Sequence, residues 1–127
     1  MNTKLLMTAS AIILGIIGLS LSFIPIEITE YLNLDTNIIS TLSFQLLGAL
    51  YLGFSMMNWM AKGSIIGGIY NRPIAIGNFM HFGVGAFALV KLVSSIEMHQ
   101  EIFISLTVIY AIFALSFAYV FRTNPGK

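Results

Sequence analysis

The sequence predicts an all-α integral membrane protein, a bundle of four transmembrane helices with short loops. Hydrophobic residues make up 57% of the 127 residues and charged residues only 9%, whereas soluble domains carry about 25% charged residues. Four apolar segments are each long enough to cross about 30 Å of hydrocarbon, which takes about 20 helical residues. Their apolar period is helical and they are far longer than strands, which argues against a β-barrel.

The first span is predicted over about residues 5–24. It ends before Pro25, whose ring disfavours a continuing helix. Its apolar run is too long for the core of a signal peptide, and no A-x-A-like cleavage site follows it, so we expect a retained helix. The second span is predicted over about residues 38–61, after three residues whose side-chain oxygens can cap a helix N-terminus: Asp35, Thr36 and Asn37.

The third span is predicted over about residues 73–93, with Pro73 in the first turn, a position that suits proline. The fourth is predicted over about residues 102–121, and all four belong to one domain, residues 1–127. Small residues that let helices approach closely follow one stripe of each span. They include Ala11, Gly15, Gly18 and Ser22 in the first span, Gly48 and Ser55 in the second, Gly77, Gly85 and Ala88 in the third, and Thr107, Ala111, Ala114 and Ala118 in the fourth.

Charged residues predict the orientation. Every basic residue but one falls at the N-terminus, in the second loop or at the C-terminus: Lys4, Lys62, Arg72, Arg122 and Lys127. Every acidic residue falls in the first or third loop: Glu27, Glu30, Asp35, Glu97 and Glu101. The positive-inside rule therefore predicts that both termini are cytoplasmic (N-in, C-in). Lys91 is the exception, and it lies near the outer end of the third span, where its long side chain can reach the headgroups.

Several function classes lack the residues they need. The absence of cysteine excludes disulfides and thiolate metal sites, and a net charge of +1 does not indicate nucleic-acid binding. No carboxylate lies inside a span, so no buried acid–base pair is predicted. His99, in an outer loop, is the only histidine besides His81, which argues against haem and makes metal binding the weakest role for His81. We expect no cofactor and favour a non-enzymatic role.

The candidate ligand-binding residues are polar side chains inside the spans. On the second span, Tyr51, Ser55 and Asn58 follow one stripe; on the third, Asn78 and His81 share a side; on the fourth, Tyr110 lies near mid-membrane. They predict a polar seam between the second and third spans that opens to the cytoplasm. An ionisable residue inside a membrane is a functional candidate by default, and its partner would be Tyr51 or Tyr110. Three roles stay open for His81: hydrogen bonding between helices, ligand binding, and proton relay or metal binding.

The segments LLGALYLGFSMMNWMAKG (residues 46–63) and GGIYNRPIAIGNFMHF (residues 67–82) resemble small bacterial four-span membrane proteins, loosely the DoxX-like group. This resemblance implies a four-helix bundle in a bacterial inner (cytoplasmic) membrane and implies no catalytic residues. The four-span plan is also similar to that of small multidrug transporters. Those proteins use an acidic residue in the first helix, and residues 5–24 contain none.

Together these observations predict a non-enzymatic membrane protein. It would bind a lipid- or quinone-like ligand, or act as a small subunit of a membrane assembly, with membrane lipids and a second copy or another membrane protein as partners. The alternative is a small oligomeric transporter in which His81 titrates. An enzyme acting on an apolar substrate is the third possibility.

Overall fold

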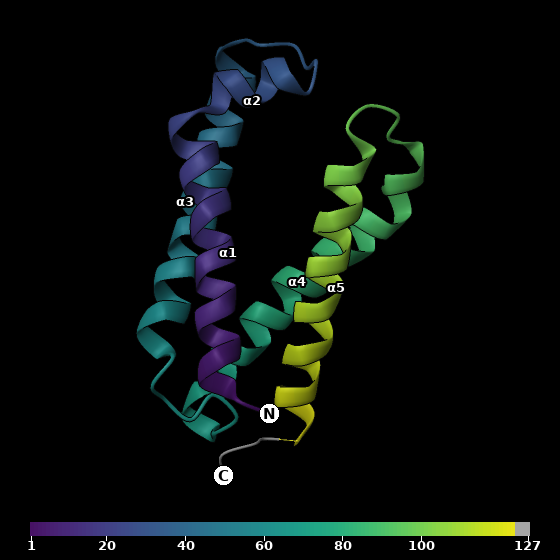
Figure 1. Ribbon diagram of the computed structural model, residues 1–127. Coiled ribbons are helices and arrows are strands. Elements are labelled where there is room, and N and C mark those ends of the chain that lie inside the picture. Colours follow the sequence, from purple (N-terminus) through teal and green to yellow (C-terminus); the bar gives the residue numbers. More distant parts are fainter. Residues whose placement is uncertain (124–127) are drawn as a thin grey trace. The chain divides into compact units, whose positions relative to one another are not determined.

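The computed structural model describes residues 1–123, which form helices joined by turns (Figure 1). Four helices are long: α1 (Thr3–Phe23), α3 (Ile38–Ala61), α4 (Arg72–Leu92) and α5 (Gln100–Thr123). A short helix, α2 (Pro25–Tyr31), and two 3-10 turns, η1 (Ile69–Asn71) and η2 (Val93–Ser95), lie between them. The four long helices are long and apolar enough to cross a membrane. The predicted all-helical fold with four spans is confirmed, and the chain is a multi-pass membrane protein.

The observed helices follow the predicted spans, and their ends differ by two residues or fewer. The helix α5 extends two residues beyond the prediction at each end, whereas α1 and α4 each begin earlier and end one residue earlier than predicted. Lys127, one of the basic residues used to predict the orientation, lies outside the described residues. By its internal packing the chain divides into two compact units. One is residues 7–61, and among the described residues the other combines residues 1–6 with residues 62–123.

In the unit of residues 7–61, α1 and α3 pack side by side through small residues (Figure 1). A methyl group added at Gly48 would lie 2.9 Å from both the backbone oxygen of Gly18 and the backbone nitrogen of Ser22. One added at Gly18 would lie 2.9 Å from the backbone nitrogen of Leu52. The small-residue stripe of the first span is therefore the surface that meets α3. The hydrophobic effect does not hold helices together within lipid, so close van der Waals packing of this kind is what stabilises the pair.

The helix α2 is not among the predicted elements. Pro25 disfavours continuation of α1, as predicted, but it also opens α2, where a proline in the first turn loses no hydrogen bond. The helix ends in a turn at Asn33, which has a φ of 54° and whose N–H bonds to the carbonyl oxygen of Glu30. The hydroxyl groups of Thr29 and Thr36 share a hydrogen bond of 2.8 Å, which joins α2 to the segment leading into α3.

Asn37 caps the N-terminus of α3. Its side-chain oxygen accepts hydrogen bonds from the backbone N–H groups of Ile39 and Ser40, each at 2.9 Å. Two of the N–H groups that a helix start leaves without intrahelical partners are thus satisfied. Among the three predicted capping residues, Asn37 takes this role, and the Thr36 hydroxyl is bonded to Thr29.

In the other unit, α4 and α5 form an antiparallel hairpin. Pro73 lies in the first turn of α4, as predicted. At this end of the hairpin, the Arg72 guanidinium lies 5.4 Å from the centroid of the Phe121 ring, a distance typical of a cation–π contact. Further along, the buried Phe82 of α4 stacks on two rings of α5, with centroid distances of 4.8 Å to Phe113 and 5.9 Å to Phe117.

Candidate functional site

Two polar side chains of α3 bond to α1. Ser55 donates to the carbonyl oxygen of Ala11 at 2.6 Å, and the amide nitrogen of Asn58 donates to the hydroxyl oxygen of Ser10 at 2.9 Å. Asn58 and Ser10 are fully buried, so their bond satisfies groups that would be costly to leave unpaired in an apolar environment. The sequence placed Ser55 and Asn58 on a seam with the third span; the bonds described here lead to the first.

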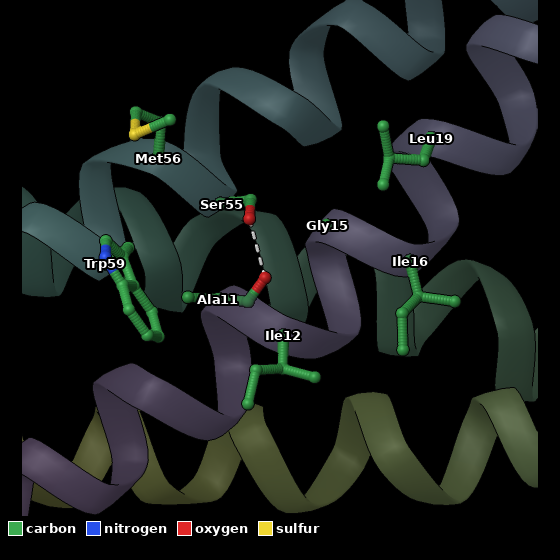
Figure 2. Close-up of a pocket in the computed structure, with 8 residues that line it drawn as sticks. All are labelled: Ala11, Ile12, Gly15, Ile16, Leu19, Ser55, Met56 and Trp59. Atoms are coloured by element: carbon green, nitrogen blue, oxygen red, sulfur yellow. Dashed lines mark hydrogen bonds between the residues drawn. The ribbon is translucent and has the colours of Figure 1, made fainter.

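A cleft lies beside the Ser55 bond, between α1 and α3 (Figure 2). Its volume is about 390 Å³. The lining residues are Ala11, Ile12, Gly15, Ile16 and Leu19 of α1 and Ser55, Met56 and Trp59 of α3. Gly15 makes room for the Ser55 hydroxyl, because a methyl group at Gly15 would lie 2.9 Å from the Ser55 oxygen.

The walls of this cleft are apolar and exposed, while its floor carries one polar group. Ile16 and Met56 are 60% and 59% exposed. Ser55 is half-buried, and after donating its proton to Ala11 its oxygen can still accept a hydrogen bond. Trp59 lies near the end of α3, and Trp side chains favour the membrane–water interface. The cleft thus runs from Trp59, near the end of α3, to a hydroxyl group among apolar side chains.

In the other unit, His81 and Tyr110 form a hydrogen-bonded pair. The Nε2 atom of His81 lies 3.0 Å from the Tyr110 hydroxyl, which joins α4 to α5. Gly85 makes room for this tyrosine, because a methyl group there would come within 2.5 Å of the ring. The Tyr110 ring is buried and packs edge-on against Phe82 at a centroid distance of 5.1 Å. Tyr110 is one of the two partners predicted for His81, and their bond fixes how the hairpin helices pair.

The two remaining predicted residues are also inside the spans. Asn78 is fully buried on α4, and its amide group donates to the carbonyl oxygen of Ile74 in the same helix, at 3.0 Å. Tyr51 is half-buried on α3. Of the six predicted residues, His81 and Tyr110 are hydrogen-bonded to each other, and Ser55 lines the α1–α3 cleft.

Three features of the α1–α3 pair were not among the predicted site residues: Ser10, which bonds to Asn58, and the Ala11 carbonyl group and Trp59 at the cleft. Ser10 lies one position from the small-residue stripe of the first span, so helical spacing did not predict that it meets another helix. A backbone carbonyl carries no sequence signal at all. Trp59 does carry one, since a lone Trp near a span end indicates an interface anchor, but only the fold shows that it borders a cleft.

Comparisons with known proteins add no relative. No family model, no curated protein and no solved structure matches the chain. The function therefore has to be inferred from the residues and their geometry.

Proposed function

We propose that this protein is a non-enzymatic membrane protein that binds a lipid- or quinone-like ligand in the α1–α3 cleft. The observation that carries the proposal is the cleft itself, an apolar groove of about 390 Å³ with a single hydroxyl group at its floor. Both ligand classes combine a long apolar tail with an oxygen-bearing head. The tail would lie against Ile12 and Ile16. A hydroxyl group of a lipid or quinol head would donate to the Ser55 oxygen, whereas a quinone carbonyl would accept the Ser55 proton in place of the Ala11 carbonyl oxygen.

The membrane and the orientation belong to the same proposal. The distribution of basic residues supports cytoplasmic N- and C-termini. Trp59 would then lie at the cytoplasmic surface, and the ligand would enter from the inner leaflet. The resemblance to DoxX-like proteins supports a bacterial inner membrane.

Native mass spectrometry of the protein released from mild detergent tests the proposal, with the bound molecules extracted and identified. We expect an adduct of fixed stoichiometry, whose identity distinguishes a membrane lipid from a quinone. Ile16→Phe adds an aromatic ring to the cleft wall and should lower the number of bound molecules per chain by one. Ile104→Phe is the matched control, because Ile104 is similarly exposed on α5 and does not line the α1–α3 cleft.

A bare protein, or an adduct equally strong in the Ile16→Phe variant, would contradict ligand binding in this cleft. A bare protein that runs as a defined oligomer, or with another membrane protein, would instead favour a role as a small subunit of an assembly.

A small oligomeric transporter is the second candidate function, and the His81–Tyr110 bond favours it. This bond puts a titratable ring and a hydroxyl group 3.0 Å apart within two spans, and titratable side chains inside a membrane relay protons in pumps and transporters. In proteoliposomes, substrate-dependent flux that is lost in His81→Leu would support transport. If Ile16→Phe left this flux unchanged, transport would replace ligand binding in the cleft as the proposed function.

A further inference from the structure

A second groove opens on the α4–α5 hairpin, and no polar side chain lines it. Its volume is about 350 Å³. Small residues, among them Gly83, Ala86 and Ala114, leave space between the two helices. Two large lining residues, Phe87 and Leu115, are 82% and 73% exposed. An apolar groove of this kind on a transmembrane hairpin suits a hydrocarbon chain.

The one basic residue that departs from the charge pattern lies at an end of this groove. Lys91 follows Phe87 by four positions on α4, so the two residues share a helix face. Lys91 is exposed, and it forms no ion pair with any other residue among 1–123. The acidic residues at this end of the hairpin are Glu97 and Glu101. A lysine at the end of a span is costly unless it finds an anion or the aqueous interface.

We propose that the groove and Lys91 form a binding site for one anionic phospholipid. The acyl chain would lie along the groove, and the lipid phosphate would pair with the Lys91 ammonium group. Along α4 the groove runs from Phe79 to Val90, about 16 Å at 1.5 Å per residue. That length matches half of the roughly 30 Å hydrocarbon thickness, so an acyl chain in the groove would bring its headgroup to the level of Lys91.

This site is separate from the α1–α3 cleft and does not depend on the function proposed for it. The two sites belong to different units of the chain, and their lining residues do not overlap. They also differ in what they offer a headgroup: the cleft offers a hydroxyl group, and the hairpin groove offers a positive charge.

The test is native mass spectrometry of the full chain, released from detergent containing equal amounts of phosphatidylglycerol and phosphatidylcholine with identical acyl chains. We expect phosphatidylglycerol adducts to exceed phosphatidylcholine adducts about fivefold, which corresponds to the ~1 kcal/mol of one Lys near a membrane surface. Lys91→Gln should remove this preference. Arg122→Gln is the control, because it removes the same charge from an exposed residue at the other end of the hairpin.

The groove itself is tested by Ala114→Leu, which adds bulk to its lining. We expect this variant to lose the adducts of both lipids at this site, while Ala49→Leu, on an exposed position of α3, keeps them. The same preference in Lys91→Gln as in the unmodified chain, or an equal loss in Arg122→Gln, would overturn the proposal. Lys91→Arg should restore the preference, since it restores the charge.

Discussion

The close approach of α1 and α3 at Gly48 predicts that one methyl group there destabilises the protein. In Gly48→Ala the new carbon would meet the Gly18 oxygen and the Ser22 nitrogen, each at 2.9 Å. Both are backbone atoms, so a side-chain rotation cannot relieve the clash and the helices must move apart. Overpacking of this kind costs about 1–3 kcal/mol, against which alanine gains about 0.5–1 kcal/mol over glycine within a helix.

Gly53 offers a matched control on the same helix. A methyl group at Gly53 would have no neighbour within 4 Å, so Gly53→Ala keeps only the gain in helix propensity. Because this gain cancels between the two variants, their free energies of unfolding should differ by about 1–3 kcal/mol. Reversible unfolding in mixed micelles, titrated with sodium dodecyl sulfate and followed by circular dichroism, measures this difference. Equal stabilities for the two variants would refute the packing of α1 against α3 at this point.

Three further predictions test the hairpin and the start of α3. In Gly85→Ala the added methyl group would lie 2.5 Å from the Tyr110 ring, so the ring must shift and the melting temperature should fall. Gly83→Ala, whose methyl group has its nearest neighbour at 3.8 Å, should melt unchanged or higher, and the reverse order would contradict the hairpin packing. Tyr110→Phe removes the hydrogen bond to His81 and should lower the free energy of unfolding in micelles by about 0.6 kcal/mol, typical of such bonds between transmembrane helices; a variant as stable as the original would show that the bond adds nothing. Asn37→Ala removes the cap of α3 and should cost about 1 kcal/mol, with faster hydrogen exchange in the first turn of that helix; unchanged exchange there would contradict the cap.

The sequence predicted the spans well because their signals are local. An apolar run of helical period, a proline at a helix start and a capping Asn each act within a few residues, so Pro73 and Asn37 have the predicted roles. The helix α2 was missed because its seven residues are too few to show an apolar period and follow directly after a span. Its start, however, has a local signal in Pro25.

The site could be predicted only in part, because helical periodicity assigns a residue to a face and does not identify the helix that meets this face. Ser55 and Asn58 share a stripe, as predicted, but the bonds described for them lead to Ala11 and Ser10 of α1. Tyr51 and Tyr110 were the two predicted partners of His81, because they lie at a similar depth in their spans. Tyr110 is the one whose hydrogen bond to His81 is described. The α1–α3 cleft could not be predicted, since a cleft depends on how two faces fit.

Trp59 gives the most direct test of ligand binding in the α1–α3 cleft, because it borders the cleft and is the only Trp in the chain. Its fluorescence would be recorded in mild detergent while a phospholipid or a quinone with a brominated tail is titrated in. The proposal predicts saturable quenching at a fixed stoichiometry, which is lost in Ile16→Phe and retained in Ile104→Phe. Quenching that rises without saturation, and equally in both variants, would show that the ligand only partitions into the micelle and would contradict binding in the cleft.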